Sequence, residues 1–294
     1  IRAVFAHGTA KPPTKPGELP YTHVPHPRDR IEALRKGRFS SDDRLVTLAM
    51  AILGPHWGTY EVAEQDLRLA RELNLLSTSH ATRRIPDQIA PGGYGRLVKA
   101  GLIGPDHNLV HGNYIEDEEP ERAGQARLEL RGHAAEPVTL RVRKFGGMPS
   151  IGIDVEPIVT GEMFREMQAA LLHARWASLR DNAAAGNPPF QTIPIRSREA
   201  LMWATIGNAR AMGLEDQIGS ITPGKKADIV MLRANDLNLF PVHDPLLSIT
   251  IDGVVKKQGG RRMFPDEVLE ARKQALLASI ERIMRAGSFT VKAA

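Results

Sequence analysis

Gly219-Ser-Ile-Thr-Pro-Gly-Lys-Lys-Ala-Asp-Ile-Val-Met-Leu232 is the stretch of sequence that says most about the fold. Thr222-Pro-Gly224 predicts a tight turn, because proline presets one backbone angle and glycine accepts a positive φ. Ala227–Leu232 is short and mostly apolar, which predicts a strand. The segment before it predicts a helix, with Ser197 as N-cap and Gly213 as its stop. The chain therefore changes character at Gly219.

After Leu232 the sequence predicts short strands and turns rather than alternating strands and helices. Ile249–Lys256 predicts a second short strand, and Gly259-Gly260 predicts a turn after it. Asp266–Arg285 predicts a helix that closes the chain. The strands on either side of residue 240 indicate a small β appendage rather than a continuation of the upstream pattern.

Upstream of Gly219, short apolar runs alternate with helical patterns, which is typical of βα units around a parallel sheet. The predicted strands are Ile1–Ala6, Leu45–Leu53, Leu75–Ser79, Asn108–Ile115, Ala126–Leu130 and Ser150–Val155. The predicted helices before Ser197 are Asp29–Arg38, Tyr60–Glu72, Tyr94–Ala100 and a long one carrying the apolar stripe Met163, Met167, Ala170, Leu171 and Ala174. The fold class is therefore α/β.

Length, charge and composition narrow the functional classes. The 294 residues accommodate an α/β barrel of roughly 250 residues. The formal charge of +5 is scattered, with no basic tract containing interleaved aromatic residues, so no nucleic-acid partner is expected. No run of about 18 apolar residues predicts a membrane span, and we expect a cytoplasmic protein. Because there is no cysteine, a metal site has to use His, Asp, Glu or a modified Lys.

Three predicted strands end near residues that bind metals. His80 follows one strand, His111 lies in the next, and Asp154 lies in Ser150–Val155. In an α/β barrel the carboxyl ends of the strands converge on one site, and imidazole with carboxylate suits Zn²⁺ or Fe²⁺. Each residue also has an ordinary structural interpretation. A single strand histidine is more often a core or surface residue, and Asp154 is also placed to cap a helix beginning near Thr160.

A resemblance favours the metal site. Gly219–Leu232, the preceding Ala204–Leu214 and the hairpin pattern Asp252–Gly260 resemble the amidohydrolase superfamily, in particular the branch of cytosine deaminase, guanine deaminase and the triazine hydrolases. The resemblance implies a (β/α)8 barrel of the TIM type with a small flanking β-sandwich. It implies a barrel over residues 1–215 that begins at about strand three, part of the sandwich over 216–260, and a C-terminal helix over 261–294.

The same resemblance implies roles for the three residues. Asp154 would be the strand-eight metal ligand and general base, His80 the strand-five ligand, and His111 the strand-six histidine that contacts the water or the substrate. One divalent metal ion, zinc or iron, would be the cofactor. The reaction would be hydrolysis of a C–N bond in a small cyclic or heteroaromatic substrate.

Three features depart from the family pattern. No His-x-His pair, which completes the family's metal site, occurs in the sequence, and residues 116–131 look too short and polar for helix six plus strand seven. The deaminases of this branch usually have Glu three residues after the strand-five His, where this chain has Arg83. Arginine does not shuttle protons at neutral pH, which argues against the standard deaminase mechanism. Arg83 and Arg84 would bind an anionic substrate or be solvated loop charges.

His56 and Trp57 follow another strand end, so we expect them to line the substrate pocket, with Trp57 stacking on a flat ring. The partners expected are a small-molecule substrate and, from the hydrophobic loops and the C-terminal helix, a second copy in a homo-oligomer. The alternative is a non-catalytic barrel that acts as a binding or scaffold protein.

Overall fold

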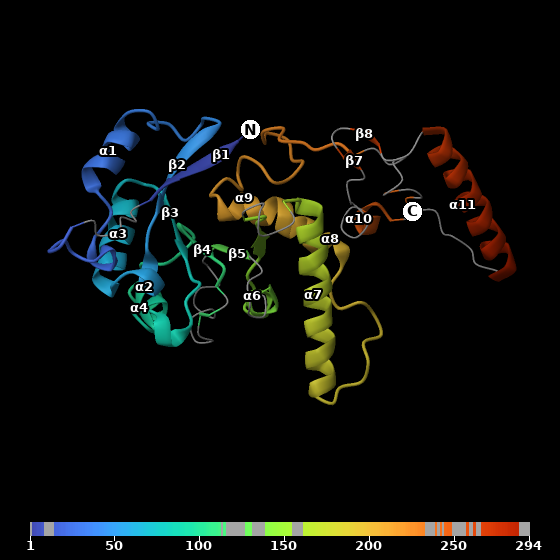
Figure 1. The fold of residues 1–294 in the computed structure, drawn as a ribbon, viewed down its shortest axis with the longest axis horizontal. Coiled ribbons are helices and arrows are strands. Elements are labelled where there is room, and N and C mark those ends of the chain that lie inside the picture. Colours follow the sequence, from blue (N-terminus) through green and yellow to red (C-terminus); the bar gives the residue numbers. More distant parts are fainter. Residues whose placement is uncertain are drawn as a thin grey trace. The chain divides into compact units, whose positions relative to one another are not determined.

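The computed structural model describes residues 2–8, 15–112, 114–115, 127–130, 139–154, 161–232, 239, 242, 244–248, 257–258, 261–262 and 266–287. The chain divides into two compact units, Ile1–Asp228 and Ile229–Ala294. Figure 1 shows both as ribbons. Each unit is described by itself.

The first unit is built on one sheet of six parallel strands that pair in the order of the sequence. They are β1 Ala3–His7, β2 Val46–Ala51, β3 Leu76–His80, β4 His107–Val110, β5 Arg127–Leu130 and β6 Pro149–Ile151. Parallel neighbours in chain order are the arrangement of an α/β barrel, so the predicted α/β class is confirmed. All six predicted strands exist, within a few residues of their predicted bounds.

Helices lie between the strands of the first unit and after the last of them. They are η1 Tyr21–His23, α1 Arg28–Lys36, α2 Gly54–Trp57, α3 Tyr60–Glu72, η2 Ile85–Asp87, α4 Gly93–Lys99, α6 Thr139–Lys144, α7 Met163–Ala184, α8 Ser197–Met202, the π-helical turn η3 Trp203–Gly207 and α9 Asn208–Ala211. The Thr59 side chain caps α3 by accepting from the backbone N–H of Val62 at 3.3 Å. Arg196, not Ser197 as predicted, is the N-cap of α8, because the Glu199 side chain accepts its backbone N–H.

The core lies between the sheet and the helices that connect its strands. Ile31 of α1, Leu67 of α3 and Leu97 of α4 are buried together with Met50 and Leu109 of the sheet. Burying each such side chain stabilises the fold by roughly 1.5–3 kcal/mol. In α7 the predicted stripe is confirmed in part, since Met167, Leu171 and Ala174 are buried, whereas Met163 and Ala170 are half-buried.

Two departures concern the strands. The β4 strand ends at Val110 rather than at Ile115, because His111 and Gly112 both adopt positive φ angles that break the extended backbone. The expectation that residues 116–131 are too short and polar for helix six plus strand seven is wrong for the strand, since β5, within the predicted Ala126–Leu130, pairs with both β4 and β6. Residues 116–126 lie outside the described residues.

The part of the stretch Gly219–Leu232 that lies in the first unit, Gly219–Asp228, is held there by its backbone and by charged side chains. Gly219 has φ +86°, and a Cβ there would lie 2.6 Å from Ala209 Cβ, so only glycine fits. The Lys226 side chain pairs with Asp43 at 2.5 Å, and Asp228 pairs with Arg2 at 2.7 Å. These pairs join segments more than 180 residues apart in the chain.

The predicted strand Ala227–Leu232 is wrong, because this stretch has no regular secondary structure. A strand needs a neighbour that takes up its backbone N–H and C=O groups. Among the described residues no strand pairs with it, and the expected partner Ile249–Lys256 lies outside them. Val230 and Met231 are exposed.

The second unit contains α10 Pro245–Leu247, the antiparallel pair β7 Lys257–Gln258 and β8 Arg261–Arg262, and α11 Asp266–Gly287. The helix predicted over Asp266–Arg285 is confirmed. The flanking β-sandwich and the boundaries predicted for it stay predictions. In the described part of the chain, no helix is long and apolar enough to span a membrane.

Candidate active site

The carboxyl edge of the sheet carries the two predicted metal ligands, His80 and Asp154, and the predicted catalytic residue His111. The register places His80, Val110, Glu129 and Ser150 in one row across β3, β4, β5 and β6. His80 is the last residue of β3, and His111 directly follows β4. Asp154 follows the end of β6 by three residues. In an α/β barrel this edge is where catalytic groups converge.

His80 and His111 lie side by side. Their ring centroids are 5.3 Å apart with the planes tilted by 35°. His111 has φ +72° and Asp154 has φ +50°, a region that residues other than glycine rarely occupy. Backbone strain of this kind persists only where the surrounding structure holds it in place, and it is found most often at functional sites.

The donor chemistry suits zinc or iron, but the ligand set is incomplete among the described residues. His80 and His111 supply imidazoles and Asp154 a carboxylate at the same edge, which are the donors that Zn²⁺ and Fe²⁺ accept. No three His, Asp or Glu side chains of the described residues come together closely enough to hold an ion. The structure therefore places the predicted ligand His80 beside His111, the histidine predicted to contact water or substrate, and the described residues do not complete a ligand set around His80 and Asp154.

His56 and Trp57 form the short helix α2, directly after β2. Gly54 begins it with φ +63°, and a Cβ there would lie 2.6 Å from the Tyr94 hydroxyl, so glycine lets α2 approach α4. His56 is 1% exposed and meets the Tyr94 ring edge-on at 5.1 Å. Burial, helped by the charge of Arg83, lowers the pKa of His56 to about 4. His56 is therefore neutral at pH 7 and accepts the Arg83 backbone N–H on Nδ1 at 3.3 Å.

A cavity of about 500 Å³ opens beside these residues. It is lined by Trp57, Thr82, Arg83, Arg84, Asp87 and Tyr114. These residues come from α2, from the segment after β3 and from the segment after β4, so the cavity belongs to the carboxyl edge. Trp57 and Arg83 line this cavity, whereas His56, also predicted to line it, is not among the lining residues and contacts one of them through the Arg83 backbone N–H.

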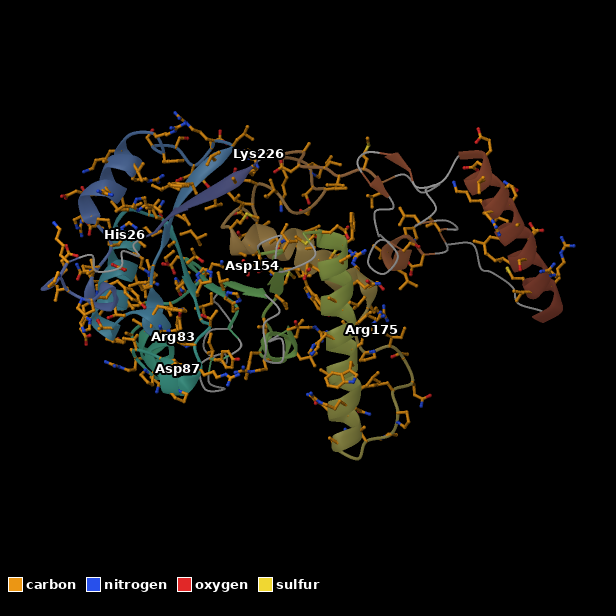
Figure 2. The ribbon with its side chains drawn as sticks, in the orientation of Figure 1. His26, Arg83, Asp87, Asp154, Arg175 and Lys226 are labelled. Carbon is orange, nitrogen blue, oxygen red and sulfur yellow. The ribbon has the colours of Figure 1, made fainter. Side chains whose placement is uncertain are left out.

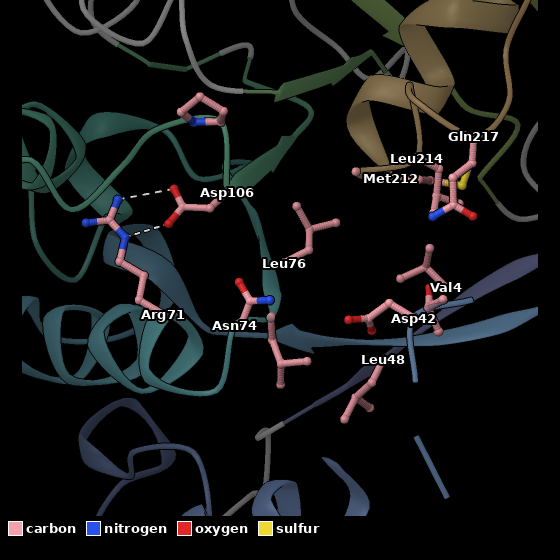
Figure 3. A pocket seen from close by; sticks show the side chains of 14 residues that line it. Val4, Asp42, Leu48, Arg71, Asn74, Leu76, Asp106, Met212, Leu214 and Gln217 are labelled. Atoms are coloured by element: carbon pink, nitrogen blue, oxygen red, sulfur yellow. Dashed lines mark hydrogen bonds and ion pairs between the residues drawn. The ribbon is translucent and has the colours of Figure 1, made fainter. Parts of the chain in front are cut away.

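A second cavity, of about 320 Å³, lies at the opposite end of the strands (Figure 3). Val4, Leu48 and Leu76 line it near the amino ends of their strands. Its prominent carboxylate, Asp106, is already bound by the guanidinium of Arg71 at 2.5 and 3.1 Å. In α/β barrels the residues at the amino ends of the strands stabilise the fold, and the catalytic residues lie at the carboxyl ends. We therefore do not assign the active site to this second cavity.

One polar cluster was missed by the sequence reasoning. His26 Nε2 lies 3.1 Å from His7 Nδ1, and the His26 backbone N–H donates to Asp66 Oδ1 at 2.8 Å. Asp66 is completely buried on α3, and burial raises its pKa to about 7. The available signal was its spacing, because Asp66 lies four residues from Val62 and from Ala70 on the buried stripe of α3.

Comparisons with known proteins show which proteins the chain is similar to. The model of the amidohydrolase family matches residues 131–258. A 5-methylthioadenosine/S-adenosylhomocysteine deaminase of Teredinibacter turnerae is 32% identical over 131 residues, which are 45% of this chain and 27% of that protein. An 8-oxoguanine deaminase of Pseudomonas aeruginosa is 24% identical over 85% of this chain and 58% of its own length. The chain thus spans only part of the relatives it matches.

Solved structures show the same fold. An atrazine chlorohydrolase variant of Arthrobacter aurescens, complexed with zinc and atraton, matches with a TM-score of 0.68 at 18% identity, over 94% of this chain and 66% of that one. An adenosine deaminase of Xanthomonas campestris with bound zinc matches with a TM-score of 0.59 at 21% identity, over 86% and 61%. These neighbours are TIM-type barrels, which confirms the predicted barrel class. The family match over residues 131–258, the relatives and the shared barrel together support membership of the chain in the amidohydrolase superfamily.

Proposed function

We propose that the protein is a metal-dependent hydrolase that cleaves a C–N bond, in an amide, amidine-like group or ring, of a small cyclic or heteroaromatic molecule. The observation that carries the proposal is the shared carboxyl edge at which His80, His111 and Asp154 lie. The deaminases and the zinc-containing structures to which the chain is similar support it.

The roles proposed for these groups are those that the family resemblance implies. A divalent ion, zinc or iron, supplies a water of lowered pKa when it is bound. His80 and Asp154 would be its ligands in this chain. Asp154 would take the proton of the attacking water and pass it to the leaving nitrogen. His111 would orient the water or the substrate by hydrogen bonding.

The pocket residues would hold the substrate ring. Trp57 offers a flat aromatic face at the cavity, and neutral His56 fixes the backbone of the segment that carries Arg83. Arg83 stands in place of the acid of the deaminases and cannot act as that proton shuttle, which favours hydrolysis without it. Cytoplasmic location and a homo-oligomeric state stay predictions.

The first test is Asp154→Asn in the full-length protein reconstituted with zinc or iron. Asparagine accepts a positive φ, so the backbone should persist while the base is lost. Turnover of a heteroaromatic amine or amide should fall by about 10²–10⁴-fold. Asp216→Asn, an exposed aspartate just after α9, is the matched control and should be unaffected.

Metal analysis gives the second arm. Full-length protein that binds neither zinc nor iron, and gains no activity from either, would contradict the proposal. That result would favour the alternative, a non-catalytic amidohydrolase-like barrel that acts as a binding or scaffold protein.

A further inference from the structure

The side chain of Arg83 is held rigidly at the cavity of the carboxyl edge. Its backbone N–H donates to His56 Nδ1 at 3.3 Å, and its carbonyl accepts from Gln88 Nε2 at 3.1 Å. The Nη1 atom donates to the carbonyl of Asp87 at 2.9 Å. The guanidinium lies over the Trp57 ring, 4.1 Å from its centroid. These contacts fix both ends of the residue.

The Trp57 ring, over which the Arg83 guanidinium lies, is held in place as well. Trp57 Nε1 donates to Thr82 Oγ1 at 3.1 Å, which sets the plane of the indole ring. Gln88 also donates to the carbonyl of Tyr114 at 3.3 Å and so links the segment after β3 to the segment after β4. The guanidinium is therefore oriented before any ligand arrives, which lowers the entropy lost on binding.

This guanidinium differs from other arginines of the same unit. Arg28, Arg35 and Arg71 each bind a carboxylate through two nitrogens. Neither Arg83 nor its neighbour Arg84 forms an ion pair with a carboxylate of the described residues. Among the described residues, one N–H of the Arg83 guanidinium has a hydrogen-bond partner, the Asp87 carbonyl.

Arg84 adds a second positive charge to the cavity. Its guanidinium lies 6.0 Å from the centroid of the Tyr114 ring. The Asp87 carboxylate lines the same cavity and offsets one of the two charges, so the formal charge of the lining is +1. Figure 2 shows Arg83 and Asp87 close together on the first unit. The cavity thus combines a net positive charge with two aromatic faces.

We propose that this cavity selects substrates in which a carboxylate is attached to a flat heteroaromatic ring. Arg83, with Arg84 beside it, binds the carboxylate, because a planar guanidinium matches a carboxylate with two parallel hydrogen bonds. Trp57 and Tyr114 contact the ring. The inference rests on the proposed hydrolase function and names its substrate class, because Arg83 follows His80 by only three residues.

The test uses nicotinate and nicotinamide, a pair with the same flat ring that differs in charge. Their affinities for the full-length protein are measured by calorimetry, once without metal in the presence of EDTA and once with zinc. We expect nicotinate to bind at least about tenfold more tightly, as one charge-assisted pair predicts. Arg83→Gln should remove that preference and leave nicotinamide binding unchanged.

Further variants separate anion binding from a purely structural role. Arg83→Lys should restore little of the preference, because an ammonium lacks the planar fork. Arg84→Gln should reduce the preference less than Arg83→Gln does, and it carries the test if the Arg83 variant unfolds, because Arg84 is exposed. Arg38→Gln, an exposed arginine after α1, should change nothing.

Three results would overturn the inference. They are equal affinities of the two probes for the unaltered protein, absence of nicotinate binding at millimolar concentration, or equal weakening of both probes by Arg83→Gln, which would make Arg83 a structural clamp. Because the affinities are also measured without metal, these failures are distinct from failure of the hydrolase proposal, which shows only in the metal and turnover experiments.

Discussion

His107 and His111 lie at opposite ends of β4, four residues apart, and the fold treats them differently. His107, at the amino end, is 1% exposed and has hydroxyl partners at both ring nitrogens, Ser77 Oγ at 2.7 Å and Ser79 Oγ at 2.9 Å. Ser79 in turn bonds the Tyr94 hydroxyl at 2.9 Å. Burial lowers the pKa of His107 to about 4, so the ring is neutral at pH 7.

His111, at the carboxyl end, faces the His80 ring from a strained backbone. The difference shows that position along a parallel strand, rather than residue type, separates a core histidine from a candidate catalytic one. The interior of the sheet satisfies a polar ring with hydroxyls, whereas the carboxyl edge gathers rings from neighbouring strands.

The largest expected effect concerns the edge. His111→Asn keeps a residue that tolerates a positive φ, so the free energy of unfolding should change little. Turnover of the metal-loaded protein should fall by about 10²–10⁴-fold, the usual contribution of a positioned proton-transfer or hydrogen-bonding group. Steady-state kinetics and urea unfolding on the same preparation measure both. An active variant would remove His111 from the site.

The buried histidines predict that the free energy of unfolding depends on pH. His56 and His107 have folded pKa values lowered to about 4 from 6.5, so the unfolded chain binds more protons between these values. Stability is therefore fully present above about pH 6.5 and is lost as the pH falls towards 4, by roughly 3 kcal/mol for each histidine. Urea unfolding across this window checks it, and a flat profile contradicts it.

Asp66 should act in the opposite direction. Its folded pKa is raised from 3.8 to about 7, so the folded chain binds more protons in that range. Its contribution is largest at acidic pH and disappears as the pH rises towards 7. Asp66→Asn should therefore make the loss of stability on acidification steeper than in the unaltered protein.

A smaller effect is expected from the hydroxyls of the interior. Ser77→Ala removes one partner of the buried His107 ring and should cost about 1–3 kcal/mol of unfolding free energy. Turnover per folded molecule should persist, because Ser77 lies three residues before His80. Ser40→Ala, an exposed serine, is the control. A loss of turnover without a loss of stability would link the interior to the site.

The smallest effect concerns the stretch Gly219–Leu232. Asp228→Asn breaks the ion pair with Arg2. Because the Asp228 side chain is 42% exposed, the loss of unfolding free energy should be small. The cost should shrink further at high salt, because exposed ion pairs are screened. Thermal unfolding at two salt concentrations measures it. A large, salt-independent loss would mean that this pair does more than tether the stretch.

Much of the fold was predictable from local patterns. The six strands of the sheet and helices such as α3 and α11 follow from apolar periodicity and end signals within a few residues. The strand expected at Ala227–Leu232 was not formed, because strand formation depends on a partner that local sequence does not supply. Helix α6 was not predicted, since Thr139–Lys144 is too short for its periodicity to show.

By itself, the sequence determined the α/β class, the family resemblance and the three edge residues His80, His111 and Asp154, because these depend on local order along the chain. Only the tertiary structure decided that the His80 and His111 rings are neighbours, that His107 is enclosed by serines, and that Trp57 supports an arginine without a carboxylate partner among the described residues. The physical reason is that strand register and loop packing join residues 25 or more positions apart, and no local pattern encodes those contacts.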